Sequence, residues 1–204
     1  GRDAKDIKYR YNWNAPIIWS RHEPNVYYHG SQYLLKTTDL GKTWTEASPD
    51  LTRNEKEKQG RPGVPFTNEA VGAENYGTLA YVTESPFEKG VIYTGSDDGL
   101  VHITKDGGAH WQNITPAGLQ ECLINAIEIS PFDKATAYIA TTRYKFNDHT
   151  PGLYKTTDYW APAFERSIAW NDPAIGIQWP IHGLPILSAK DQKGYSLAQA
   201  EHFA

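Results

Sequence analysis

Short stretches of alternating apolar and polar residues, each bounded by turn-forming residues, follow one another along most of the chain. Alternation puts every second side chain on the same face of an extended backbone, so each stretch predicts a half-buried β-strand. The predicted strands are residues 16–19, 26–29, 32–36, 44–46, 77–84, 91–95, 100–104, 111–114, 123–130, 135–142 and 152–155. The pattern therefore predicts an all-β protein.

One turn between two predicted strands has a spacing that can be sought elsewhere in the chain. Thr104 lies two residues before Asp106, Gly108 two after it and Trp111 five after it. The Asp carboxylate can accept hydrogen bonds from backbone N–H groups just ahead of it, and Gly supplies the positive φ that the turn needs. The Trp side chain buries a large aromatic surface over the turn. The spacing predicts a hairpin turn held from inside by Asp106.

The turn recurs, which makes it a repeat. A copy with the same offsets is formed by Thr37, Asp39, Gly41 and Trp44. A third copy begins at Asp158 but lacks the Gly and brings its Trp too early. A Ser-Pro-Phe leader precedes the last two copies, at Ser85 and Ser130, and a looser version starts at Ser20. Short strands with regular turns in such units predict β-propeller blades, about three of them with four strands each.

Composition agrees with a folded β protein. Hydrophobic residues make up 39% of the 204 residues and aromatic residues 13%, which argues against disorder. The formal net charge is −4 and the basic residues are scattered, so nothing indicates a nucleic-acid partner. No apolar run approaches the roughly 20 residues of a membrane span. No cofactor is indicated.

The candidate reactive groups are few. The lone cysteine, Cys122, excludes an internal disulfide and a multi-cysteine metal site, and its apolar surroundings favour a buried thiol over a nucleophile. The seven His show no close pairing that indicates a metal site. Asp97 and Asp98 precede Gly99, and this spacing favours a tight turn over a cation or sugar site. Residues 54–63 form a polar loop, either a solvated insertion or a loop that faces a ligand.

The repeated Asp turns and their leaders resemble Asp-box (bacterial neuraminidase) repeats, and residues 1–158 resemble the sortilin-type, glycosyl-hydrolase-like β-propellers of secreted bacterial proteins. The resemblance implies that the boxes lie at the outer edges of blades, away from the axis where ligands bind, and have a structural role. It implies a secreted or periplasmic location and a glycan or protein ligand. The sialidase motif that carries an arginine is absent, so a sialidase-like glycoside hydrolase is a lesser alternative. The polar ligand surface is sought at Glu69, Glu74, Tyr76 and Arg143.

The end of the chain, residues 153–204, resembles the C-terminal part of dTDP-4-dehydrorhamnose 3,5-epimerases, which are cupin-type jelly rolls. The resemblance implies that Tyr154 is the acid at the sugar ring, that Trp160 lines a dTDP-sugar site and that Asp191 orients a catalytic His. The family's His base and phosphate-binding residues belong to its N-terminal part, to which nothing in this chain corresponds. Epimerisation next to a carbonyl needs a base within hydrogen-bond reach of the proton. The enzyme would be cytoplasmic.

Both resemblances fit the hexapeptide at 153–158, so we expect propeller blades over 1–152 and an epimerase-like tail over 153–204, joined as a chimera. A divergent propeller is the alternative. The chain contains no Met and opens at Gly1, so we expect a fragment or a processed piece. The main hypothesis is a non-catalytic or catalytically incomplete binding or scaffold module, and the second is a 3,5-epimerase represented by its tail. Open blade edges expose unpaired strands, which favours self-association.

Overall fold

The computed structural model describes residues 3–60, 75–156, 171–175, 194–196 and 198. The chain divides into two compact units, Gly1–Trp160 and Ala161–Ala204. In the second unit the described residues include the short 3₁₀ helix η5 (Pro173–Ile175). The Asp172 carboxylate opens this helix by accepting a 2.8 Å hydrogen bond from the Ala174 N–H.

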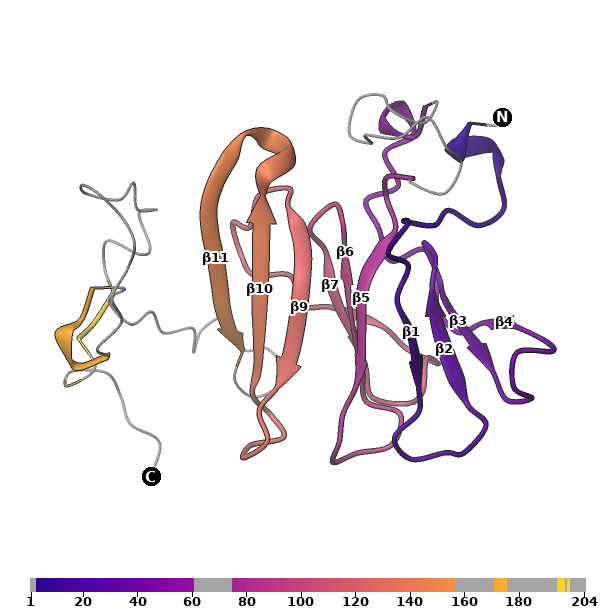
Figure 1. The fold of residues 1–204 in the computed structure, drawn as a ribbon. Coiled ribbons are helices and arrows are strands. Elements are labelled where there is room, and N and C mark those ends of the chain that lie inside the picture. Colours follow the sequence, from indigo (N-terminus) through magenta and orange to yellow (C-terminus); the bar gives the residue numbers. More distant parts are fainter. Residues whose placement is uncertain (1–2, 61–74, 157–170, 176–193, 197, 199–204) are drawn as a thin grey trace. The chain divides into compact units, whose positions relative to one another are not determined.

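Three antiparallel sheets make up most of the described part of the first unit (Figure 1). The first sheet contains β1 (Ile17–Trp19), β2 (Tyr27–Gly30), β3 (Leu34–Thr37) and β4 (Thr45–Glu46). The second contains β5 (Leu79–Glu84), β6 (Ile92–Ser96), β7 (Val101–Thr104) and β8 (Gln112–Asn113). The third contains β9 (Leu123–Ile129), β10 (Ala137–Arg143) and β11 (Asp148–Thr156). The described part of the first unit also contains the 3₁₀ helices η1 (Ala4–Asp6), before β1, and η2 (Lys56–Lys58) and η3 (Tyr144–Phe146), which lie in connections between strands.

The all-β prediction is confirmed, and every predicted strand in the described residues is present. One boundary differs clearly. The sequence placed a loop before Gly152, but β11 already begins at Asp148. The chain reverses early because η3 is followed by Asn147 in the left-handed conformation, with φ of 54°. Arg143 then pairs with Asp148 at 2.9 Å, at the end of the hairpin next to the turn.

Successive sheets pack face to face and enclose two apolar clusters. The cluster between the first and second sheets contains Val26, Tyr28, Leu34, Leu51, Leu79, Val82 and Ile92. The cluster between the second and third sheets contains Val91, Tyr93, Val101, Ile103, Ile114, Cys122, Ile124, Ile127, Ala137 and Ile139. The second sheet is thus covered on both faces. As a result all five residues of β6 are buried, whichever face their side chains occupy.

Polar contacts between the sheets repeat from one pair to the next. Glu23 pairs with Lys89 at 3.0 Å across the first interface, and Glu88 pairs with Lys134 at 2.9 Å across the second. These two ion pairs occupy equivalent positions after the leaders at Ser20 and Ser85. The second sheet therefore packs on the first in the same way as the third packs on the second.

Glycine permits a close approach of strands at the second interface. A Cβ atom added at Gly95 would lie 2.3 Å from Cγ2 of Ile124 in β9, far inside van der Waals contact. The equivalent residue of the first sheet is Gly30, where a Cβ would lie 3.0 Å from that of Leu79. The third sheet has Ala140 at this position, where the side chain is half-buried.

We predict that Gly95→Ala lowers the free energy of unfolding by about 1–3 kcal/mol, because the added methyl overpacks the interface. Urea denaturation followed by tryptophan fluorescence measures the change. The matched control is Ala140→Gly, which should cost only about 0.5–1 kcal/mol as an ordinary strand glycine. A Gly95→Ala variant as stable as the wild-type chain would contradict the close approach.

Candidate functional site

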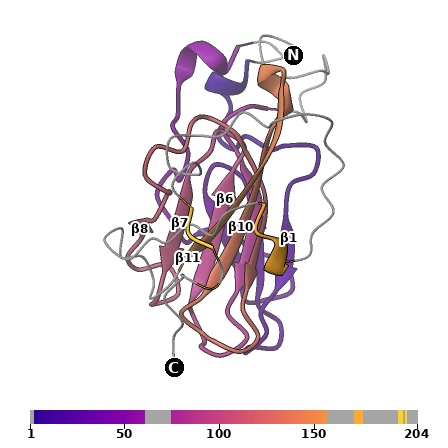
Figure 2. The same ribbon diagram turned by 90° about the vertical axis from the view of Figure 1, so that its left-hand side faces the viewer.

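Tyr76, Asp97, Asp98 and Arg143, which the sequence singled out, lie at one end of the first unit. Leu79 pairs with Ser96 there, so β5 begins and β6 ends at this end. The helices η1, η2 and η3 gather at the same end in both views (Figures 1 and 2). Ile92 pairs with Thr104 at the opposite end, directly before the turn that contains Asp106. The polar residues and the repeated Asp turns therefore lie at opposite ends of the sheets.

Asp97 is a buried carboxyl in the turn between β6 and β7. Its Oδ1 accepts hydrogen bonds from the backbone N–H groups of Gly77 at 3.0 Å and Thr78 at 2.9 Å. Its Oδ2 is buried and has no hydrogen-bond partner among the described residues. Burial, followed by the neighbouring Asp98 carboxylate, raises the pKa of Asp97 to about 7. The group fixes the start of β5 at the cost of an incompletely paired carboxyl.

Asp98 ties the same turn to the connection between the first two sheets. Its Oδ2 accepts the Arg53 N–H at 2.8 Å, and the Arg53 Nε donates to the Asp98 carbonyl at 2.7 Å. The Ser96 hydroxyl donates to Oδ1 at 2.5 Å. Burial raises the pKa of Asp98, and these hydrogen bonds oppose the rise. Gly99, with φ of 91°, completes the tight turn, and both carboxylates bond to the protein itself.

Tyr76 and Arg143, two of the predicted ligand residues, meet at Glu121. The buried Tyr76 hydroxyl donates to Oε1 of Glu121, and Lys58 Nζ donates to both carboxylate oxygens at 2.8 and 2.7 Å. Arg143 Nε donates to the Glu121 backbone carbonyl at 3.1 Å. Burial and the Glu121 hydrogen bond raise the pKa of Tyr76. Lys145 Nζ lies 5.7 Å from the centre of the Tyr76 ring.

A pocket of about 160 Å³ adjoins this network, since Lys145 belongs to both. Its walls are Asn12, Trp13, Asn14, Ala80, Leu123, Ile124, Asn125, Tyr144 and Lys145. We call it the Asn–Trp pocket. Trp13 is 74% exposed, and Tyr144 is also exposed. Asparagine amides both donate and accept hydrogen bonds, and exposed aromatic faces offer flat apolar surface. Apart from the Lys145 ammonium the wall is uncharged, and this combination suits a neutral, hydroxyl-rich ligand.

The two Asp turns at the other end have nearly identical internal hydrogen bonds. Asp39 Oδ1 accepts from Thr43 N at 2.9 Å, and Asp106 Oδ1 accepts from His110 N at 2.9 Å. The Thr37 and Thr104 hydroxyls donate to these carboxylates, each at 2.8 Å. The hydrogen bonds lower the pKa of Asp39 to about 2, chiefly through the N–H of Thr43. They also lower the pKa of Asp106, chiefly through the N–H of His110.

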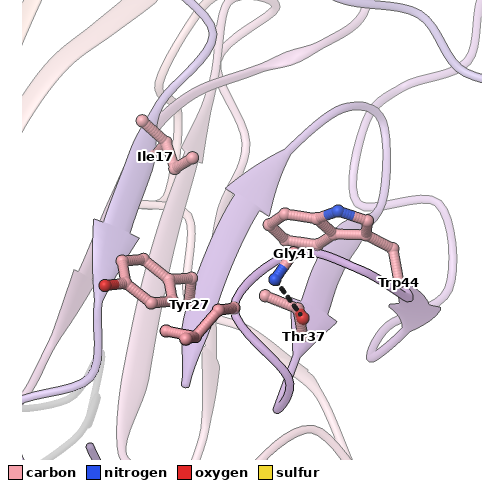
Figure 3. Close-up of a pocket in the computed structure, with 6 residues that line it drawn as sticks. Ile17, Tyr27, Thr37, Gly41 and Trp44 are labelled. Carbon is pink, nitrogen blue, oxygen red and sulfur yellow. Dashed lines mark hydrogen bonds between the residues drawn. The ribbon is translucent and has the colours of Figure 1, made fainter. Parts of the chain in front are cut away.

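A second pocket, of about 250 Å³, lies beside the first Asp turn (Figure 3). It is lined by Ile17, Tyr27, Thr37, Leu40, Gly41 and Trp44. The Gly41 N–H donates to the Thr37 hydroxyl at 2.9 Å, and the Trp44 ring lies over this turn (Figure 3). The pocket is lined mostly by apolar side chains and contains no charged residue.

The remaining sequence-predicted residues fall in three places. Tyr154 lies on β11 opposite Ile139, and its ring packs against the apolar cluster between the second and third sheets. Cys122 is buried, as predicted, and burial raises the pKa of its thiol to about 11. The residues that lie outside the described ranges are Glu69, Glu74, Asp158, Trp160 and Asp191.

Sequence reasoning missed Glu121, Lys58 and the Asn–Trp pocket. The only signal for the pocket was the Asn12-Trp13-Asn14 triplet, since a Trp between two amides is unusual for a core strand. Within the described ranges, no group of three or more His, Cys, Asp and Glu side chains is arranged to hold a metal ion. In the same part of the chain, no helix has the length and apolar character to cross a membrane.

Comparison with known families finds a similarity at the end of the chain. The family model described as dTDP-4-dehydrorhamnose 3,5-epimerase matches residues 134–199. An epimerase of that name from Pseudomonas aeruginosa is 49% identical over 57 residues, which are 28% of this chain and 32% of the relative. One from Neisseria gonorrhoeae is 54% identical over 52 residues, 26% of this chain and 16% of the relative. The chain thus spans a third or less of the length of these curated relatives. The family match begins upstream of the expected junction at 153–158 and includes β10 and β11.

Comparison with solved structures identifies the fold of the sheets. A GH74 xyloglucanase from Xanthomonas campestris has a TM-score of 0.51 and 18% identity, covering 70% of this chain and 20% of its own. A GH74 enzyme from Niastella koreensis has a TM-score of 0.48 and 20% identity, covering 70% and 19%. The first of these likenesses supports a propeller-type fold. The chain therefore resembles two kinds of protein, as the sequence predicted.

We predict that Asp97→Asn flattens the pH dependence of stability. Between 3.8, the ordinary pKa of an Asp, and about 7, Asp97 keeps its proton in the folded chain and loses it in the unfolded chain. The free energy of unfolding should therefore fall as pH rises through this window, by up to about 1.4 kcal/mol per pH unit. Asparagine does not titrate and can still accept the two N–H bonds.

Urea denaturation at several pH values measures the effect. The free energy of unfolding of the variant should rise relative to that of the wild-type chain as pH rises. Asp6→Asn, a change at an exposed carboxyl in η1, is the control and should leave the slope unaltered. Parallel profiles for Asp97→Asn and the wild-type chain would contradict the assignment.

Proposed function

We propose that this chain is a non-catalytic or catalytically incomplete binding module, in which each of the three sheets is one propeller blade and the Asn–Trp pocket holds a neutral glycan. The observation that carries the proposal is the composition of the pocket wall. Three asparagine side chains and two exposed aromatic side chains line one concave site, beside the first strands of the second and third sheets. A secreted or periplasmic location goes with this proposal.

The positions of the carboxylates favour binding of a glycan without its hydrolysis. Most glycosidases place two carboxyl groups on either side of the scissile bond. The described wall of the Asn–Trp pocket contains no carboxylate. The nearby acidic groups, Asp97, Asp98 and Glu121, are not part of this wall, and each accepts hydrogen bonds from backbone N–H groups, from Tyr76 or from Lys58. A glycan in this pocket would therefore find hydrogen-bond partners and a stacking surface rather than an acid and a base.

A sialidase-like activity has less support. That chemistry needs several arginines free to hold one carboxylate of the substrate. Arg10 Nη2 pairs with Asp50 at 3.0 Å, Arg53 bonds to Asp98, and Arg143 pairs with Asp148 at 2.9 Å. Each of these three arginines is thus engaged with a different part of the chain.

We predict that Trp13→Ala weakens glycan binding by about tenfold or more, because an exposed aromatic anchor dominates such a site. A panel of soluble neutral oligosaccharides is screened first, and the best one is titrated by calorimetry. Trp19→Ala is the matched control, since Trp19 is 72% exposed but lies outside the pocket, and its affinity should match that of the wild-type chain. Equal losses for both variants, or no binding across the panel, would refute the glycan proposal.

The second candidate is a nucleotide-sugar 3,5-epimerase of which this chain holds the C-terminal part, and it would be cytoplasmic. The observation that favours it is the identity of 49–54% with known epimerases over 52–57 residues. The placement of Tyr154 against the apolar cluster does not favour it, because an acid must reach the substrate. The exposed His149 lies on the same strand but belongs to no motif that supplies a base.

Titration of the chain with dTDP by calorimetry separates the two candidates. We predict no heat of binding at micromolar dTDP for the glycan-binding module. Micromolar binding of dTDP would instead indicate a nucleotide site and contradict the main proposal, and a loss of dTDP-sugar affinity in Tyr154→Phe would place Tyr154 at the sugar. Tyr138→Phe, on the neighbouring strand and the opposite face, is the control for that variant.

A further inference from the structure

The interface between successive sheets is used twice with equivalent residues on each side. On the side of the earlier sheet lies a tyrosine of its second strand, Tyr28 at the first interface and Tyr93 at the second. Each tyrosine is only 1% exposed. We call this side the Tyr face. The equivalent residue of the third sheet is Tyr138, which is 40% exposed.

On the side of the later sheet lie an aliphatic residue of its first strand and, at the first interface, a tryptophan of its Asp turn. The aliphatic residue is Val82 at the first interface and Ile127 at the second, 4% and 0% exposed. We call this side the Trp face. The equivalent residue of the first sheet is Ile17, which is 61% exposed, and Trp19 on the same face is 72% exposed. The three described sheets therefore leave one exposed face of each kind, on the first and the third sheet.

The pocket beside Trp44 marks where a partner would sit on the exposed Trp face (Figure 3). At the equivalent place in the second sheet, Trp111 Nε1 donates to the Ala47 carbonyl of the first sheet at 2.9 Å. A Cβ at Gly108 would lie 2.3 Å from that same oxygen, so the glycine makes room for it. Gly41 is the counterpart of Gly108, and among the described residues only the Trp44 ring lies within 4 Å of its Cβ position. In the second sheet this space is filled by the neighbouring sheet.

We propose that a second copy of this chain docks head to tail, with the Tyr face of its third sheet against the Trp face of the first sheet. The two faces correspond to the halves of an interface that the chain already forms twice, except that Ala140 on the Tyr face of the third sheet stands where the first two sheets have Gly30 and Gly95. Such a contact uses different surfaces on the two partners and can continue into rings or longer assemblies. It buries sheet faces and is distinct from pairing between strand edges. The proposal does not depend on the ligand of the Asn–Trp pocket.

Two blocking variants test the proposal by sedimentation velocity over a range of concentrations. Ile17→Glu places a carboxylate on the Trp face, and Tyr138→Glu places one on the Tyr face. Burying an unpaired charge should weaken association by at least about tenfold in each case. Each variant alone should therefore sediment as a monomer where the wild-type chain associates. An equimolar mixture keeps one intact face of each kind and should form a one-to-one dimer that grows no further.

The other outcomes overturn the proposal. Association of Tyr138→Glu but not of Ile17→Glu would mean that two Trp faces pair symmetrically. Association of both variants would point to strand edges, and a wild-type monomer or a monomeric mixture would exclude head-to-tail docking. Phe132→Glu, at a 96% exposed aromatic in the turn before β10, is the control and should associate like the wild-type chain. Circular dichroism checks that each variant folds. If Ile17→Glu does not fold, Trp19→Glu on the same Trp face replaces it, and if Tyr138→Glu does not fold, Leu153→Glu on the same Tyr face replaces it.

Discussion

The packing of one sheet face on the next is the interaction on which the rest of this structure depends. A four-stranded sheet as short as the second one has little core of its own, and it becomes stable by burying both faces. The sequence of β6 reflects the burial of both faces. Its residues are apolar, small or hydroxylic, and none is charged, because neither face of the strand reaches water. Gly95 shows how closely the sheets approach, since even a methyl group would collide with Ile124.

Close packing of the sheets also accounts for the buried polar network at one end. Connections that cross between packed sheets carry backbone groups out of water, and each such group needs a partner. Asp97 accepts hydrogen bonds from the N–H groups of Gly77 and Thr78, while Arg10 Nε donates one to the Gly77 carbonyl at 3.0 Å. The raised pKa of Asp97 is the consequence, since a carboxyl recruited for this purpose is itself desolvated. These acids are thereby explained by architecture, and the Asn–Trp pocket remains the better candidate for a ligand.

The strands and the Asp turns could be predicted from sequence because their determinants are local. Alternation over a few residues sets each strand, and the hydrogen bonds of Asp39 and Asp106 reach only to residues four positions ahead. The network could not be predicted in the same way. Tyr76 and Glu121 are 45 residues apart, and nothing near Glu121 indicates that its carboxylate will accept a hydrogen bond from a buried tyrosine. The early start of β11 was missed because Asn147 supplies a left-handed turn without a glycine.

The third sheet is shared by the resemblance to the epimerases and the resemblance to propeller-type proteins. The epimerase match begins at residue 134, so β10 and β11 belong both to that match and to the stacked sheets. A strand offers only two faces, and alternation fixes which residues share one. On β11, Tyr154 shares the inner face with Ile139, whereas Leu153 shares the outer face with Ala140. Packing on the second sheet therefore covers part of the Tyr154 side chain, to which the epimerase resemblance assigns a role at the sugar ring.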